Sequence, residues 1–321
     1  KLGLMEGRSF YHPESWATIR DEHWKEVTLY TDPGRLYDEL IRISPEDKPF
    51  ISRLCKDIRT LSRMESPVDM TLLDIIRYIP VFGLMKRYKP TVHDVLSQVK
   101  SPVLRGLLAA GFGWEGQSMF FPLMGLGMQG AKNAGYPIGG SLPFAKAIEK
   151  RYRDLAGTIR YKSIVTAIIT EKNRAIGVRL ADGIELYADY VISCADGHTT
   201  IFEWLKGAYC DDTIRGYYQN LKPFPPIVFI SFGLDTDLSS LPKDLTVLFD
   251  KPVDIAGVAQ ESISFRNHVH DPTLYPPGKG VITTWITADY SFWDQLPYQS
   301  DEYRATKDDV GRKVFALLCQ Q

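Results

Sequence analysis

The chain has 321 residues, of which 44% are hydrophobic and 24% are charged, as in ordinary folded globular proteins. Its formal net charge of −1 excludes binding of nucleic acid through an overall positive charge, and no apolar run approaches the roughly 18 residues of a membrane-spanning helix. The four cysteines form no Cys-x-x-Cys pair, so we expect no structural zinc site and a reducing, cytoplasmic setting.

The first part of the chain predicts strands and then helices. Residues 1–31 contain short alternating strands such as Glu26–Thr31. Asp32 can cap a helix that begins after it, and Ser44-Pro45-Glu46-Asp47 begins a second helix, which should run to about Arg63. We assign residues 32–138 to a helical subdomain whose apolar segments are interrupted by Pro80, Pro90, Pro102 and Pro122.

Residues 139–222 have a different order, which is helix, strand, hairpin and strand. Apolar residues recur at helical spacing from Leu142 to Leu155. Extended segments come next at 158–161 and 163–168, and Gly183 joins a hairpin over 177–188. The apolar run Tyr190–Ala195 closes the unit as a strand, with helices predicted over 198–205 and 211–221.

The last part of the chain predicts a sheet and a closing helix. Beyond Pro223, Pro225 and Pro226, strands are predicted at 227–234, 245–250, 262–267 and 281–287. We assign residues 223–300 to a β-rich substrate domain and 301–321 to a helix that returns toward the nucleotide-binding part. The fold class is therefore α/β, in a mixed α+β form.

One segment, Gly125 to Gly130, fits the dinucleotide-binding pattern G-x-G-x-x-G. That pattern should come after a strand, open a helix and meet an acidic residue about 20 positions later. Pro122 interrupts the run before the segment, and Gly135 and Pro137 interrupt the run after it. Close packing of a helix, or a turn, explains these glycines better than a phosphate loop.

The order of elements over 139–196 is one that flavoenzymes use to hold the adenine half of FAD. Main-chain N–H and C=O groups of an extended residue can recognise adenine, and Val165 is the residue that we place there. A half-buried hairpin strand explains the same pattern, so the sequence leaves both interpretations open.

Other polar groupings give weaker signals. His268-Val269-His270-Asp271 could place two imidazoles on one strand face, but no third metal ligand is evident, so we predict no metal site. Ser193, Cys194 and His198 suggest no nucleophile–base geometry, and no catalytic side chain is assigned. Residues 72–89 combine apolar positions with a basic end, which suits either a core helix or a peripheral membrane contact.

Several ordered motifs resemble the phytoene desaturase-like flavoprotein family, which contains carotenoid desaturases, carotenoid isomerases and retinol saturases. Gly135–Ser141 resembles that family's Gly-Gly entry to a helix, Gly177–Gly183 its hairpin, and Val191–Asp196 its strand leading to the flavin. The segments Asp271–Lys279, Asp32–Leu36 and Ile43–Asp47 also fit. Together they cover most of the chain in the family's order.

The resemblance implies part of a glutathione-reductase-like FAD-binding domain, with Val165, Cys194 and Ala195 in contact with FAD. The family's initial G-x-G-x-x-G unit and its closing flavin-binding segment have no matching positions here. The chain therefore resembles the central portion of a longer protein, and we expect this segment alone to be inactive and to bind FAD weakly.

The resemblance also implies that FAD transfers hydride to or from a long apolar isoprenoid, carotenoid or retinoid. We expect the substrate pocket between the helices of 70–135 and the strands of 227–287. Its candidate walls are Phe229, Phe232, Trp285 and Phe292, for which a core role is the alternative. The rival functions are a flavin amine oxidase-like enzyme with a polar substrate and a non-catalytic lipid-binding module.

Overall fold

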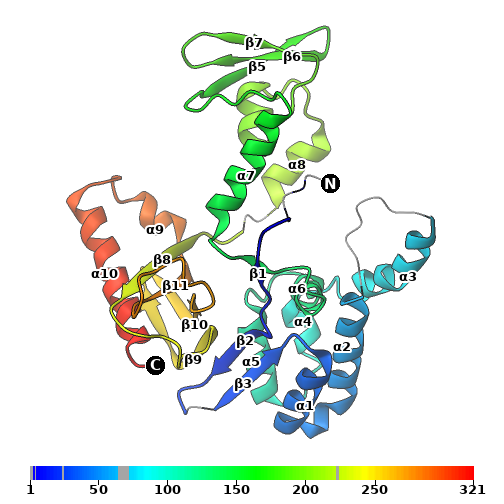
Figure 1. The fold of residues 1–321 in the computed structure, drawn as a ribbon, viewed down its shortest axis with the longest axis vertical. Coiled ribbons are helices and arrows are strands. Elements are labelled where there is room, and N and C mark those ends of the chain that lie inside the picture. The colour runs from blue at the N-terminus through cyan, green and yellow to red at the C-terminus, as the bar shows by residue number, and fades with distance from the viewer. Residues whose placement is uncertain (1–2, 4, 24, 64–71, 222–223) are drawn as a thin grey trace. The chain divides into compact units, whose positions relative to one another are not determined.

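The computed structural model describes residue 3 and residues 5–23, 25–63, 72–221 and 224–321. It divides into two compact units, one formed by residues 1–147 together with 225–321 and the other by residues 148–224. The boundary falls inside helix α7 (Ser141–Asp154), near the start of the predicted FAD-binding portion (Figure 1). The mixed α/β class predicted from the sequence is confirmed.

A six-stranded sheet organises the first unit, and its strands run in the order β3-β2-β9-β10-β11-β8. These strands are β2 (Ser15–Arg20), β3 (Glu26–Tyr30), β8 (Ile227–Leu234), β9 (Asp244–Ile255), β10 (Val258–Asn267) and β11 (Gly280–Thr287). Strand β2 runs parallel to β9, with Thr18 opposite Leu245, and the other neighbours are antiparallel. The N-terminal strands thus complete the sheet that residues 223–300 predict.

Helices α1 to α6 form the predicted helical subdomain. They are α1 (Pro33–Ile43), α2 (Lys48–Leu61), α3 (Leu72–Arg87), α4 (Val92–Leu96), α5 (Pro102–Phe112) and α6 (Phe120–Gly130), with a 3-10 turn η1 (Pro45–Asp47) before α2. The Asp32 carboxylate caps α1 by accepting from the N–H groups of Gly34 and Arg35. Pro80 lies inside α3 without ending it, contrary to the predicted interruption.

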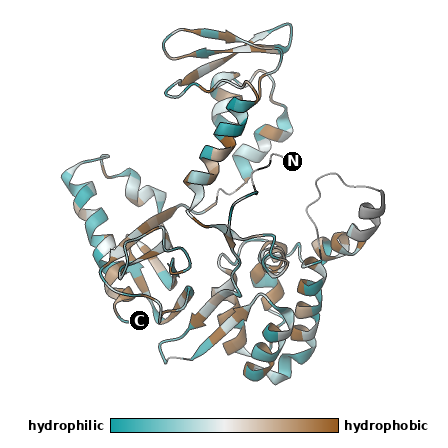
Figure 2. Cartoon of the chain, viewed as in Figure 1, coloured by the Kyte–Doolittle hydropathy of each residue, from teal (hydrophilic) through white to brown (hydrophobic). Residues whose placement is uncertain are grey.

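Two apolar cores stabilise the first unit. One joins β2 and β3 to the helices, with Ile19, Leu29, Leu40 and Leu54 fully buried. The other lies on the sheet and includes Val310, Val314 and Leu318 of α10 (Asp301–Leu318). Figure 2 shows hydrophobic residues recurring along the strands of the sheet. Helix α10 packs against the sheet because its apolar positions complete this second core, and the return of residues 301–321 toward the FAD-binding portion stays a prediction.

The second unit holds a three-stranded sheet with the order β5-β6-β7. Its elements are β5 (Val165–Glu171), β6 (Arg174–Leu180), β7 (Glu185–Tyr187), the π-helical segment η2 (Thr199–Trp204) and α8 (Asp212–Asn220). Gly183 makes the predicted hairpin turn at φ 85°. Among the described hydrophobic residues of this unit, only Leu180 is buried.

Two predicted strands of this unit are not strands in the structure. Residues 158–161 and 190–194 lie outside every ladder, and the side chains of Tyr190 and Ile192 are each 85% exposed. A strand exists only through hydrogen bonds to a neighbouring strand, and no described strand lies beside these segments. The segment 190–194 has the apolar composition of strands that are buried on both faces.

Candidate functional site

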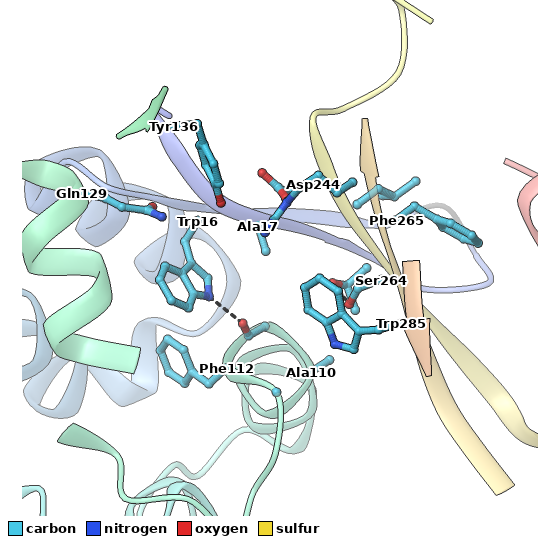
Figure 3. A pocket seen from close by; sticks show the side chains of 15 residues that line it. Trp16, Ala17, Ala110, Phe112, Gln129, Tyr136, Asp244, Ser264, Phe265 and Trp285 are labelled. Carbon is cyan, nitrogen blue, oxygen red and sulfur yellow. Dashed lines mark hydrogen bonds and ion pairs between the residues drawn. The ribbon is translucent and has the colours of Figure 1, made fainter. Parts of the chain in front are cut away.

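A cavity of about 330 Å³ lies within the first unit, between helices α5 and α6 and the six-stranded sheet (Figure 3). Its walls come from β2, β9, β10 and β11, from the ends of α5 and α6, and from the short strand β4 (Tyr136–Pro137), which pairs with β1 (Phe10–Tyr11). Its lining residues are Trp16, Ala17, Ala110, Gly111, Phe112, Gly113, Gln129, Tyr136, Asp244, Leu245, Thr246, Ser264, Phe265, Arg266 and Trp285.

The apolar wall of this cavity is fixed by a close approach of helix and sheet. The indole Nε1 of Trp16 donates a hydrogen bond of 2.8 Å to the carbonyl oxygen of Gly111, drawn as a dashed line in Figure 3. A Cβ added at Gly111 would lie 2.5 Å from Leu29 Cδ1, so only glycine allows this spacing. The Trp16 ring therefore lies beside Phe112, and the two rings form an aromatic part of the cavity wall.

The polar part of the cavity centres on Arg266. Its Nε donates a 2.6 Å hydrogen bond to Oδ1 of Asp244, and its guanidinium lies 5.3 Å from the ring centre of Tyr136 and 5.5 Å from that of Trp285. Burial, the largest single influence, would by itself lower the pKa of Arg266, but the charge of Asp244, the charge interaction with Tyr136 and the hydrogen bond to Asp244 together raise it. Burial raises the pKa of Tyr136, so the cavity holds a charged guanidinium and a neutral phenol.

A stack of aromatic and imidazole rings lies next to Tyr136. The rings of Tyr11 and His270 are stacked at 4.3 Å, and Lys243 Nζ donates a 2.7 Å hydrogen bond to the Tyr11 hydroxyl. Burial lowers the pKa of His268 and of His270, which keeps both imidazoles neutral near pH 7. Within the described residues, no group of three or more His, Cys, Asp or Glu side chains is placed to hold a metal ion.

The Gly139-Gly140 entry to α7 is anchored to the loop after β10. Gly139 and Gly140 have φ values of 92° and 77°, which side chains other than hydrogen rarely allow. The N–H of Gly139 donates a 2.7 Å hydrogen bond to Oδ2 of Asp271, which is 2% exposed. Two motifs that the sequence resemblance singled out separately therefore meet in the structure.

The glycines of the G-x-G-x-x-G segment lie within α6 and pack closely. An added Cβ would lie 2.6 Å from the Trp16 ring at Gly125, 2.6 Å from Leu61 Cβ at Gly127 and 2.7 Å from the Thr31 carbonyl oxygen at Gly130. The segment neither comes after a strand nor opens a helix. It allows α6 to approach its neighbours, as the packing interpretation predicts.

The residues predicted to contact FAD all lie in the second unit. Val165 begins β5, an edge strand of the three-stranded sheet, so one side of its main chain has no partner among the described strands. Cys194 and Ala195 lie in the exposed, irregular segment before η2. The open main-chain edge of β5 fits recognition of an adenosine group. A Gly-Gly turn does begin α7, but the Gly139 N–H there already donates to Asp271.

The four predicted pocket walls have different positions. Trp285 lines the cavity, whereas Phe229 on β8 is largely exposed. Phe232 packs on Phe315 of α10 with ring centres 5.4 Å apart, and Phe292 packs against Trp293 in the sheet core. Trp16, Tyr136 and Arg266 were not predicted as site residues, although an arginine on the predicted strand 262–267 is a signal that could have identified one of them.

Comparison with known proteins agrees with this architecture. The family model for flavin containing amine oxidoreductases matches residues 17–316. Prolycopene isomerase of Arabidopsis thaliana is 29% identical over 57% of this chain and 31% of its own length, and the phytoene desaturase (neurosporene-forming) of Rhodobacter capsulatus is 30% identical over 58% and 38%. The chain thus spans about a third of the length of these relatives.

Solved structures show the same fold. An oxidoreductase from Methanosarcina mazei aligns over 96% of this chain and 66% of its own, with a TM-score of 0.53 and 18% identity. A putrescine oxidase variant aligns over 96% of this chain and 66% of its own, with a TM-score of 0.54 and 10% identity. With 300 consecutive positions, 17–316, matched by one family model, this chain belongs to the flavin containing amine oxidoreductase family.

Proposed function

We propose that the protein is an FAD-dependent oxidoreductase that desaturates, saturates or isomerises a long apolar isoprenoid, with a carotenoid-like substrate. The observation that carries the proposal is the family match over 17–316, combined with relatives named prolycopene isomerase and phytoene desaturase. The mass of the product distinguishes desaturation, saturation and isomerisation.

The chemistry of the cavity supports an apolar substrate over an amine. Trp16, Phe112 and Trp285 supply broad apolar surface, and Asp244 is the only carboxylate among the described lining residues. That carboxylate is already paired with Arg266. A cationic amine would meet the charged guanidinium of Arg266 with no unpaired carboxylate to offset it, so the cavity favours an isoprenoid chain over the substrate of an amine oxidase-like enzyme.

For the cofactor, we assign Val165, Cys194 and Ala195 to the adenosine side of FAD. When bound, the flavin supplies hydride transfer. The residues of this chain bind the nucleotide through extended main chain, hold the substrate against aromatic walls and exclude water. The largely exposed apolar side chains of the second unit support the view that it forms part of a larger FAD-binding body.

We also propose a peripheral membrane contact through α3. Ile79, Phe82 and Met85 recur at helical spacing and are 61%, 60% and 46% exposed, next to the exposed cation Lys86. An apolar stripe beside basic groups suits a helix lying in a membrane interface. Val81 and Leu84 on the same helix are buried, so the helix also contributes to the core. Among the described helices, none combines the length and apolarity needed to cross a bilayer.

Spectroscopy and product analysis test the proposed function. The purified protein, supplied with FAD, should show the visible absorbance of bound flavin. If the reaction is a desaturation, a carotenoid precursor added in the absence of oxygen should reduce the flavin and bleach this absorbance. Mass spectrometry separates the reactions, because desaturation removes a pair of hydrogens, saturation adds a pair and isomerisation leaves the mass unchanged. A protein that takes up no FAD but binds isoprenoids would favour the lipid-binding module.

A further inference from the structure

The cavity contains a polar group whose hydrogen-bonding capacity is only partly used. Arg266 is the single cation among its described lining residues, and only its Nε is seen to donate, to Asp244. Its side chain is 29% exposed, and neither terminal nitrogen donates a hydrogen bond to a described residue. A guanidinium presents five N–H donors, so most of them remain available at the cavity.

A second polar side chain of the same cavity lacks a partner. Oε1 of Gln129 is buried and accepts no hydrogen bond from a described residue. Gln129 lies near the end of α6, and Figure 3 shows its amide turned toward the part of the cavity where Trp16 and Tyr136 lie. Leaving such an atom unsatisfied is costly, which points to a ligand group that donates a hydrogen bond. The remaining polar pair, Thr246 and Ser264, is already joined at 2.8 Å.

The charge of the cavity decides which kind of ligand group fits. Asp244 neutralises Arg266, so a ligand carboxylate would bring an uncompensated negative charge into a partly desolvated space. A hydroxyl group adds no charge. It can accept from a terminal nitrogen of Arg266 and donate to Oε1 of Gln129 or to Asp244.

We propose that Arg266 and Gln129 are specificity-determining residues that select an isoprenoid with a hydroxylated end over an unmodified hydrocarbon or a carboxylic acid. The apolar part of the ligand lies against Trp16, Phe112 and Trp285. This inference rests on the proposed function for the isoprenoid class, but it concerns ligand binding and needs no redox turnover.

A 15-carbon isoprenoid alcohol, its methyl ether and the corresponding acid form a matched probe set. Their affinities for the purified protein are measured by quenching of tryptophan fluorescence, since Trp16 and Trp285 line the cavity, and by calorimetry. We expect the alcohol to bind about tenfold more tightly than the ether, which cannot donate, and more tightly than the acid. Equal binding of alcohol and ether would overturn the proposal.

Three variants assign the effect to the named residues. Gln129→Met should reduce the preference for the alcohol over the ether and leave ether binding unchanged. Asp244→Asn should raise the affinity for the acid about tenfold, because Arg266 then carries an uncompensated charge. The double variant Arg266→Gln with Asp244→Asn removes both charges while keeping two amides that can pair, which protects against misfolding. It should weaken the binding of alcohol and ether alike, because both accept from Arg266, and should leave the alcohol preference that Gln129 supplies.

Arg312→Gln is the matched control, since Arg312 is an exposed cation on α10 that does not line the cavity, and should change none of the ratios. An alcohol preference that is unchanged in Gln129→Met, or an alcohol affinity that is unchanged in the double variant, would overturn the assignment. If no probe binds, the cavity is not an isoprenoid site and the inference fails. The proposed flavin-dependent function is then judged separately, by FAD absorbance.

Discussion

Asp271 and Gly139 are joined by a 2.7 Å hydrogen bond across 132 positions of the chain, with the carboxylate accepting from the main-chain N–H. The same carboxylate accepts from the hydroxyl and the N–H of Thr273 at 2.6 and 3.1 Å. A single buried side chain therefore fixes both the loop after β10 and the turn that begins α7. The conformation of that turn depends on a residue that no local sequence pattern could identify.

Replacing Asp271 should destabilise the first unit strongly. Asp271→Ala removes a buried carboxylate that accepts three hydrogen bonds from Gly139 and Thr273, for an expected loss of about 2–4 kcal/mol in the free energy of unfolding. Urea denaturation monitored by circular dichroism measures this loss. Thr273→Val removes fewer hydrogen bonds and should cost less, about 1 kcal/mol. Equal losses in the two variants would contradict a central role for the carboxylate.

Asp47 should contribute a pH-dependent part of the stability. Burial by itself would raise the pKa of Asp47, but hydrogen bonds from the N–H groups of Lys100 and Ser101 and from the Ser44 hydroxyl together lower it below 3.8. Because the folded-state pKa is the lower one, this stabilisation is fully present above the ordinary pKa and is lost as the pH falls through the folded-state value.

Asp47→Asn should therefore be less stable than the unmodified protein at neutral pH and should lose less stability on acidification below about pH 4. The measurement is the free energy of unfolding in urea at a series of pH values. Asp308→Asn serves as a control, because Asp308 is an exposed residue on α10. Parallel pH profiles for Asp47→Asn and the unmodified protein would show that Asp47 carries no such linkage.

The glycines of α6 should behave as packing residues. Gly127→Ala places a methyl group 2.6 Å from Leu61 Cβ and should destabilise the protein by about 1–3 kcal/mol. Gly106→Ala on α5 meets nothing within 4 Å and should stabilise it by about 0.5–1 kcal/mol through helix propensity. Thermal denaturation compares the two. A Gly127→Ala protein of unchanged stability that loses FAD binding would restore the dinucleotide-loop interpretation.

Cysteine labelling tests the proposed adenosine contact without any turnover. Cys194 and Cys319 are exposed and should react readily with iodoacetamide, whereas burial raises the pKa of the Cys55 thiol to about 12 and should keep it unreactive. A large excess of FAD should slow the labelling of Cys194 and leave Cys319 unchanged, as read by peptide mass spectrometry. Protection of neither cysteine would place the nucleotide elsewhere.

The stripe on α3 should mediate binding to anionic vesicles. Phe82→Glu replaces an exposed apolar side chain with a negative charge and should reduce co-flotation with phosphatidylserine-containing vesicles severalfold. Val103→Glu, at an exposed position on α5, is the control and should change flotation little. Flotation that is equal in all three proteins would remove α3 from the contact.

The sequence by itself determined the local elements where a capping residue or an alternating pattern lies within a few positions. Asp32 begins α1, Ile227–Leu234 forms β8 and Asp301–Leu318 forms α10, all as predicted. The ordered motifs also identified the flavoprotein family, because short segments in a fixed order carry that information without any contact between them. Local side-chain preferences and apolar periodicity are sufficient for such features.

Only the tertiary structure decided which distant segments meet. It placed β2 beside β9, Asp271 within hydrogen-bond distance of Gly139, and Arg266 near the rings of Tyr136 and Trp285. It also left residues 158–161 and 190–194 without strand partners, although the sequence of these segments predicts strands. The physical reason is the same in each case: ladder hydrogen bonds, ion pairs and close packing require a partner whose position depends on the path of the whole chain.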